Sequence, residues 1–135
     1  MHLIITSLTA SVLALLLVIL SVITIRARMK HNAAFGDAGE QRLTSAIRAH
    51  GNLTEYAPIG LILIALLEAN DASHTPLLLV AAAFVVSRVL NAIGLFNPPG
   101  PPPLTRSIGI AATLAILLGL AVWLFVLIHM PMLRG

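Results

Sequence analysis

The chain contains no cysteine among its 135 residues and has few charged residues. The absence of cysteine excludes disulfides, thiolate metal ligands and a protein thiol nucleophile. Only 10% of the residues are charged and 59% are hydrophobic, whereas a soluble domain carries about 25% charged residues. We therefore expect one integral membrane domain, with no room for a separate soluble catalytic module.

Several catalytic signatures are also missing. The sequence has no glycine-rich phosphate loop followed by lysine, no HExxH, no GxSxG and no close pair of carboxylates, so nothing in it indicates a hydrolase or a kinase. Its histidines include His2, His31, His74 and His129, which are scattered near the predicted span ends, and we predict no metal site. The net charge of +3 does not predict a nucleic-acid surface, because most basic residues cluster between Arg26 and Arg48.

The hydrophobic segments predict an all-α membrane four-helix bundle in a single domain, residues 1–135, with spans at about 3–25, 50–69, 77–96 and 104–128. A cleaved signal peptide is the alternative for the first segment, but no basic region precedes it. We expect a loop from Lys30 to Gln41 and a second helix from about Glu40 to Ala69. A turn should follow at Ala72 to Pro76. Residues 97–103, NPPGPPP, predict a stiff extended connection.

Basic residues also predict the orientation of a multi-pass protein in a bacterial inner membrane. The first connection is flanked by Arg26, Arg28, Lys30, Arg42 and Arg48, whereas no Lys or Arg marks the second connection. Because cytoplasmic loops carry an excess of basic residues, the first connection should face the cytoplasm. Both termini should then lie on the opposite side.

A polar stripe runs along the second predicted helix. Arg48, Asn52 and Glu55 fall within about 60° of each other at 100° per residue, so they should face a protein interior or a polar cavity. Arg88 lies well inside the third span and needs a partner. One hypothesis is a structural ion pair between Arg88 and Glu55. In the other, Arg26, Arg48, Arg88 and Arg106 outnumber the carboxylate, and their free guanidinium groups hold a ligand's carboxylates.

Arg106 and Ser107 begin the fourth predicted span. Free backbone amides and the helix dipole favour an anion at such a place, and a thiolate would be stabilised there. The alternative is an interfacial arginine that contacts a lipid phosphate.

Residues 42–68, RLTSAIRAHGNLTEYAPIGLILIALLE, resemble the signature of the MAPEG family, the membrane-associated proteins of eicosanoid and glutathione metabolism. The most specific part is RAHGNxxEY, and the chain also resembles the family at RAR (26–28), GDAGE (36–40), SRVLN (87–91) and TRS (105–107), most closely in its small bacterial branch. The resemblance implies a homotrimer of four-helix bundles, with glutathione bound between adjacent subunits. It also implies that a small lipophilic substrate arrives laterally from the bilayer.

The resemblance assigns roles to individual residues. Arg106, with Ser107 as a helper, would favour the glutathione thiolate and act in catalysis. The cofactor-binding set would comprise Arg26, Arg48, Asn52, Glu55 and Arg88, in which Glu55 takes the amino group and Asn52 and the arginines hold the carboxylates. The chain departs from the family's eicosanoid synthases at Thr44, Ser45, Gly51, Asn91, Leu95 and Ile110, which removes several of their polar contacts.

Three hypotheses follow. The first is a glutathione-dependent transferase or peroxidase that acts on a lipophilic electrophile. The second is a non-catalytic membrane protein that uses the polar stripe to stabilise a trimer. The third is a protein that binds another anionic thiol or lipid.

Overall fold

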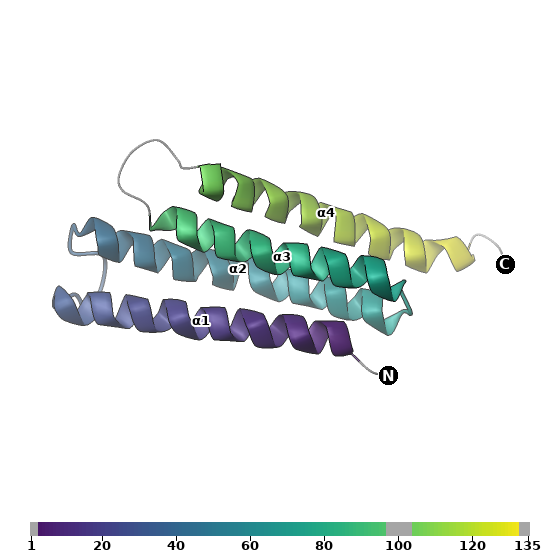
Figure 1. Cartoon of the computed structure of the whole chain (residues 1–135), viewed down its shortest axis with the longest axis horizontal. Coiled ribbons are helices and arrows are strands. Elements are labelled where there is room, and N and C mark those ends of the chain that lie inside the picture. The colour runs from purple at the N-terminus through teal and green to yellow at the C-terminus, as the bar shows by residue number, and fades with distance from the viewer. Residues whose placement is uncertain (1–2, 97–103, 133–135) are drawn as a thin grey trace.

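The computed structural model describes residues 3–96 and 104–132. Within that part of the chain there are four helices, α1 (Ile4–Lys30), α2 (Gln41–Ala69), α3 (His74–Leu95) and α4 (Leu104–Met132), which run side by side along the long axis (Figure 1). Each helix is long and apolar enough to cross a membrane. The all-α four-helix prediction is confirmed, as is the predicted second helix. The predicted extended connection, 97–103, lies outside the described residues.

The turn between α2 and α3 is shorter than predicted. Helix α3 begins at His74, so Pro76 lies in its first turn instead of the turn before it. A proline is tolerated there because the first backbone N–H groups of a helix have no intrahelical acceptor. Asp71, in the turn itself, adopts a left-handed φ of 55°, which short polar side chains tolerate.

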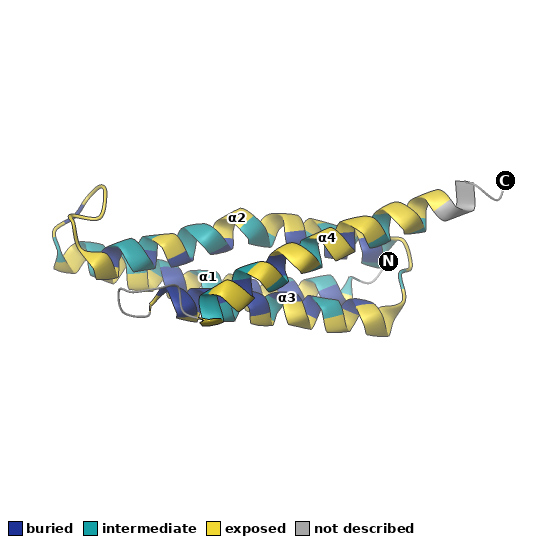
Figure 2. Ribbon diagram, turned by 90° about the horizontal axis from the view of Figure 1, so that it is seen from above, coloured by how far each residue is buried: buried dark blue, intermediate teal, exposed yellow. Residues whose placement is uncertain are grey.

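Helix α3 is the central element of the bundle. It contacts the other three helices, as α2 also does, and it is the most buried of the four, whereas α4 is the least buried. Phe84 on α3 is fully buried and lies against Gly60 of α2, where a methyl group would overlap its ring. Figure 2 shows many exposed residues along α4, and many residues of α1 are exposed as well. Those exposed positions are mostly large hydrophobics, as expected for a surface in contact with lipid.

The helices α3 and α4 approach each other closely through two glycines. A Cβ added to Gly94 would lie 2.5 Å from the backbone nitrogen of Arg106, and one added to Gly109 would lie 2.7 Å from that of Asn91. Small residues allow membrane helices to pack at such short separations. The glycines therefore place the start of α4, with Arg106, directly against the end of α3.

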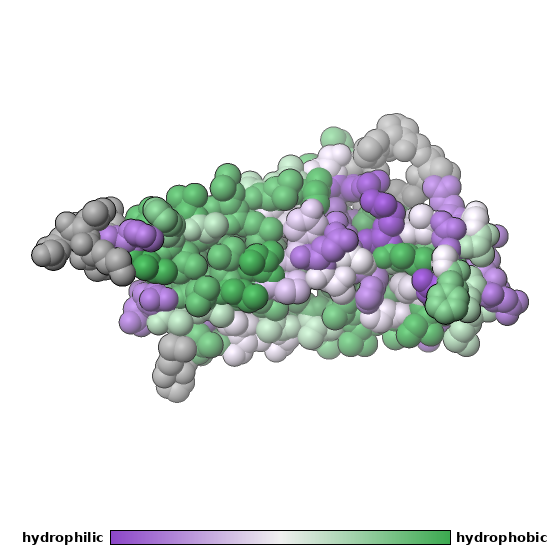
Figure 3. Space-filling view, turned by 180° about the vertical axis from the view of Figure 1, so that it is seen from behind, coloured by the Kyte–Doolittle hydropathy of each residue, from purple (hydrophilic) through white to green (hydrophobic). Residues whose placement is uncertain are grey.

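Polar residues are concentrated toward one end of the bundle. On the face shown in Figure 3, hydrophilic side chains gather toward the end that carries the α1–α2 connection, and the opposite half is mostly hydrophobic. At that opposite end, the carboxylate of Glu68 accepts hydrogen bonds from the backbone N–H groups of Ile5 and Thr6, both at 2.8 Å. It also accepts one from the Thr6 hydroxyl at 2.7 Å. Glu68 thus caps the start of α1 and fixes it to the end of α2.

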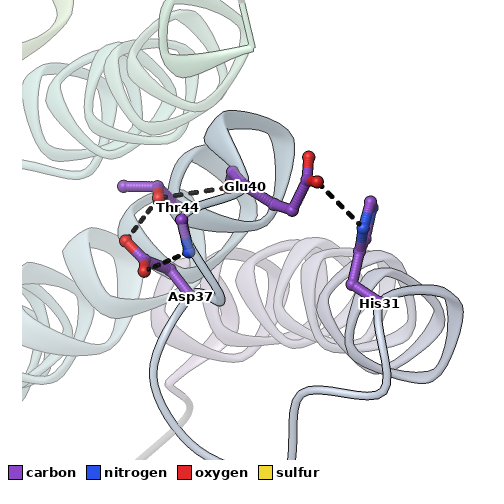
Figure 4. A network of polar contacts seen from close by, with 5 residues as sticks. His31, Asp37, Glu40 and Thr44 are labelled. Atoms are coloured by element: carbon purple, nitrogen blue, oxygen red, sulfur yellow. Dashed lines mark hydrogen bonds and ion pairs between the residues drawn. The ribbon is translucent and has the colours of Figure 1, made fainter.

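The α1–α2 connection is ordered by short polar contacts (Figure 4). Asp37 accepts hydrogen bonds from the Thr44 hydroxyl at 2.7 Å and the Gly39 N–H at 3.1 Å. These bonds, that of Thr44 first, hold the pKa of Asp37 below its ordinary value. Glu40 lies 3.6 Å from the imidazole of His31. Because these contacts join the connection to the first turn of α2, they fix the direction in which α2 leaves it.

Candidate functional site

A pocket of about 490 Å³ opens among α2, α3 and α4, in the polar half of the bundle. We call it the central pocket. Four of the predicted site residues line it: Arg48, Asn52 and Glu55 from α2, and Arg106 from α4. The rest of the lining comprises Ile47, Gly51, Tyr56, Asn91, Leu95 and Ile110. Its volume lies within the range of about 300–1,000 Å³ that is usual for small-molecule sites.

The α2 side of the pocket follows from helical spacing. Residues 48, 52 and 55 lie four and then three positions apart, so they share one face of the helix. This face lines the central pocket, as their spacing predicts. Arg106 comes to the same pocket only because Gly94 and Gly109 let α4 pack tightly on α3.

Arg88 lies beneath the pocket and does not line it. Its side chain is 2% exposed. One terminal nitrogen donates to Asn52 Oδ1 at 2.8 Å, and the other donates to the Thr113 hydroxyl and to the Gly109 carbonyl, at 3.4 Å from the latter. The guanidinium carbon also lies 5.1 Å from the centre of the Tyr56 ring, in cation–π range. Arg88 is thus held by neutral oxygens and an aromatic face.

The predicted ion pair between Arg88 and Glu55 is therefore wrong. Among the described residues the only ion pair joins His31 to Glu40. Glu55 is an exposed residue that lines the pocket, whereas Asn52, one turn before it, meets the buried guanidinium. The amide oxygen of Asn52 thus takes the place that the sequence suggested for the Glu55 carboxylate.

The bond from Arg88 also orients the Asn52 side chain. Because Asn52 Oδ1 accepts from Arg88, its NH₂ group is left to donate. The central pocket then combines this amide donor with the guanidinium groups of Arg48 and Arg106 and the carboxylate of Glu55. In the described part of the chain these three charged groups form no ion pair with one another. Such a set suits a ligand that carries carboxylates and one amino group.

Two predicted site residues lie elsewhere. Arg26 is an exposed residue of α1, and Ser107 is exposed near the start of α4. Neither lines the central pocket. The structure of the single chain thus brings Arg48, Asn52, Glu55 and Arg106 together, places Arg88 behind Asn52, and leaves Arg26 and Ser107 outside.

The positions at which the chain departs from the eicosanoid synthases cluster in this pocket. Gly51, Asn91, Leu95 and Ile110 all line it, and a Cβ at Gly51 would meet nothing within 4 Å. Leu95 and Ile110 make that part of the wall apolar. The cluster means that a ligand would have fewer side-chain donors on the α3 side than on the α2 side.

The site prediction from the sequence did not include two residues that contact Arg88. Thr113 is fully buried and accepts from Arg88, while its hydroxyl lies 2.9 Å from that of Ser87 and donates to the Gly109 carbonyl at 2.8 Å. Tyr56 lines the pocket and lies over Arg88. A signal existed for each: Thr113 is the single hydroxyl residue in the apolar run 108–128, and Tyr56 belongs to the RAHGNxxEY motif.

The comparisons with known proteins agree on one family. The model described as the MAPEG family matches residues 6–126. The inner membrane protein YecN of Escherichia coli strain K12 is 35% identical over 93 residues, which cover 69% of this chain and 71% of that protein. The protein of the same name from strain O6:H1 gives the same identity and coverage. No solved structure matches the chain.

Proposed function

The chain belongs to the MAPEG family, and we propose that it is a membrane-embedded, glutathione-dependent transferase or peroxidase that acts on a lipophilic electrophile. One observation carries the proposal. Two guanidinium groups, a carboxylate and an amide donor converge on the central pocket without ion pairs among themselves. Charged groups at membrane depth are costly unless they are paired or wetted, so such a set points to a charged ligand.

Glutathione is the proposed cofactor because its groups match the pocket. Glu55 binds the amino group, and Arg48 and the Asn52 amide bind carboxylates, while Arg88 holds Asn52 from behind. Arg106 lies beside the thiol and lowers its pKa by favouring the thiolate. In the transferase reaction the thiolate sulfur bonds to an electrophilic carbon, and the displaced group leaves. In the peroxidase reaction two glutathione molecules become a disulfide as a hydroperoxide becomes an alcohol and water.

The proposal includes a homotrimer in a bacterial inner membrane, with the first connection in the cytoplasm and both termini on the opposite side. YecN, which shares 35% identity with the chain, is named as an inner membrane protein. A trimer would also give Arg26 and Ser107 a role, because both are exposed and lie outside the pocket of a single chain. With glutathione between subunits, these residues would reach it from the subunit boundary.

The test is isothermal titration of the protein in nanodiscs with reduced glutathione, followed by an ultraviolet difference scan for the thiolate. We expect saturable binding and a thiolate band. Arg106→Ala should remove the band and leave the trimer intact, whereas Arg106→Lys should retain part of it. Glu55→Gln should weaken binding, and Glu40→Gln is its matched control because Glu40 pairs with His31 outside the pocket. Absence of binding would overturn the proposal.

A non-catalytic role is the second candidate, and the Arg88 contacts favour it. Arg88 uses Asn52, Thr113 and the Gly109 carbonyl as structural acceptors, so part of the polar stripe already stabilises the bundle. On this hypothesis the remaining charged groups would hold a trimer together. Loss of the trimer in both Glu55→Gln and Arg106→Ala, with no thiol binding in the unmodified protein, would support it.

The third candidate is a binder of another anionic thiol or lipid. The apolar wall formed by Leu95 and Ile110 favours a ligand with an apolar part beside its charged groups. A thiol carrier other than glutathione that binds saturably, when glutathione does not, would select this candidate.

A further inference from the structure

A second pocket, of about 390 Å³, lies among α1, α2 and the end of α3. It is lined by Ile23, Ala27, Lys30, His31, Arg42 and Phe96, none of which lines the central pocket. We call it the basic pocket. It combines two permanent positive charges with an apolar wall, at the end of the bundle where the polar residues gather.

The two charges of the basic pocket are available to a ligand. Lys30 and Arg42 are exposed and form no ion pair within the described residues. Glu40 lies 3.6 Å from the His31 imidazole and forms no ion pair with Lys30 or Arg42. Arg28, by contrast, is already used, because it donates to the carbonyls of Ala33, Ala34 and Gly36. The cationic rim is therefore not neutralised by the chain itself.

The apolar wall lies deeper along α1 than the charges. Ile23, Ala27 and Lys30 are spaced by four and three residues, so they share one face of α1. Ile23 lies seven residues before Lys30, which corresponds to about 10 Å of helix. Ile19, one turn further, is also exposed and continues the apolar face. This order, from charge to hydrocarbon over about 10 Å, matches that from a phospholipid phosphate to its acyl chains.

We propose that the basic pocket binds an anionic phospholipid, with the phosphate between Lys30 and Arg42 and one acyl chain along Ala27, Ile23 and Ile19. Basic pockets between transmembrane helices bind such head groups because each Lys or Arg near the membrane surface attracts an anionic lipid by about 1 kcal/mol. Phe96 closes the pocket from the α3 side. The inference is independent of the proposed enzymatic function, since it uses no residue of the central pocket.

The experiment measures the lipid retained by the full chain. The protein is extracted from nanodiscs that contain equal amounts of phosphatidylglycerol and phosphatidylcholine with matched acyl chains, and native mass spectrometry gives the ratio of the two lipids bound. We expect an excess of phosphatidylglycerol, and a fall in that ratio of about fivefold in Lys30→Gln or Arg42→Gln, which corresponds to about 1 kcal/mol. Arg28→Gln removes one charge at the same end of α1 from a side chain that does not line the pocket and is held by loop carbonyls, so its ratio should not change.

Further measurements distinguish a bound lipid from other ligands of the basic pocket. Ile23→Ala should also lower the phosphatidylglycerol retained, because it removes apolar surface at the acyl chain. Excess inorganic phosphate should not displace the lipid. Equal losses in Arg28→Gln and Arg42→Gln would overturn the proposal in favour of diffuse surface attraction, and displacement by inorganic phosphate would overturn it in favour of a small-anion site. Unchanged retention in Lys30→Gln and Arg42→Gln, with an altered oligomeric state, would show that a second copy covers the pocket.

Discussion

The close approach of α3 and α4 can be tested with two glycines of the same helix. Gly109 and Gly119 both lie inside α4, and Ala is the better helix former by about 0.5–1 kcal/mol. A Cβ at Gly109 would lie 2.7 Å from the backbone nitrogen of Asn91 and 3.0 Å from its Cα, whereas a Cβ at Gly119 would meet nothing within 4 Å. The same substitution should therefore have opposite effects at the two positions.

The expected magnitude follows from these distances. Non-bonded heavy atoms pack best at about 3.5–4.0 Å, so Gly109→Ala must separate α3 from α4 by about 0.8 Å. Overpacking of this kind costs about 1–3 kcal/mol, of which the higher helix propensity of Ala offsets a part. We expect Gly109→Ala to lose about 1–2 kcal/mol of unfolding free energy and Gly119→Ala to gain about 0.5 kcal/mol.

The assay uses the single tryptophan of the chain. Trp123 is half-buried on α4, so its fluorescence should report the separation of α4 from the bundle during denaturation with an ionic detergent. Gly109→Ala should have a lower midpoint than the unmodified protein, and Gly119→Ala an equal or higher one. A Gly109→Ala protein as stable as Gly119→Ala would refute the packing from which the position of Arg106 was derived.

Three further predictions concern polar contacts. Glu68→Gln should speed hydrogen exchange at the start of α1 and lower stability by about 1–2 kcal/mol, because one carboxamide cannot accept the three bonds that the carboxylate accepts. Asn52→Ala should lower the free energy of unfolding by about 1–3 kcal/mol, because it leaves a buried Arg88 nitrogen without an acceptor. Thermal unfolding measures the loss. Its control is Thr54→Ala, at an exposed position of α2, which should leave the stability nearly unchanged. Asp37 has a folded pKa below its unfolded value, so its stabilising effect should hold above about pH 4 and fade as pH falls through the folded pKa. In an NMR titration, Thr44→Ala should raise that folded pKa, and an unchanged carboxyl titration would contradict the assignment.

Hydropathy predicted the helices well because backbone N–H and C=O groups without hydrogen-bond partners are costly in lipid. A helix satisfies all of these groups within one segment, so few other structures can cross the membrane. Long apolar runs must be helical, and the polar first half of α2 was still recognised because no proline interrupts it before Pro58. The first error in the fold concerned Pro76, where the start of α3 was placed too late. A proline near the start of an apolar run marks a helix boundary only approximately, because it can occupy any of the first positions of the helix.

The site was predicted only as far as a single helix determines it. Helical spacing fixes that Arg48, Asn52 and Glu55 share a face, and this holds without knowledge of the neighbours. The partner of Arg88 depends on the register of α2 against α3. Asn52 and Glu55 differ by about 4.5 Å along the axis, which is shorter than an arginine side chain, so sequence depth alone could not separate them. The separation of Arg106 from Arg26 likewise depends on which side of α3 each helix packs.

The chain itself supplies acceptors for Arg88, but it supplies no ion-pair partner for the charged groups of the central pocket. This difference favours a ligand in the pocket. The two terminal nitrogens of Arg88 donate within the chain to Asn52, Thr113 and a carbonyl, whereas its buried Nε has no hydrogen-bond partner in the described part of the structure. Arg48, Glu55 and Arg106 take no part in that network within the described residues, although all three line the same pocket. A bundle whose polar groups served only its own packing would not require these three. Their convergence on one pocket is explained by a charged molecule, or a second copy of the chain, that completes their pairing.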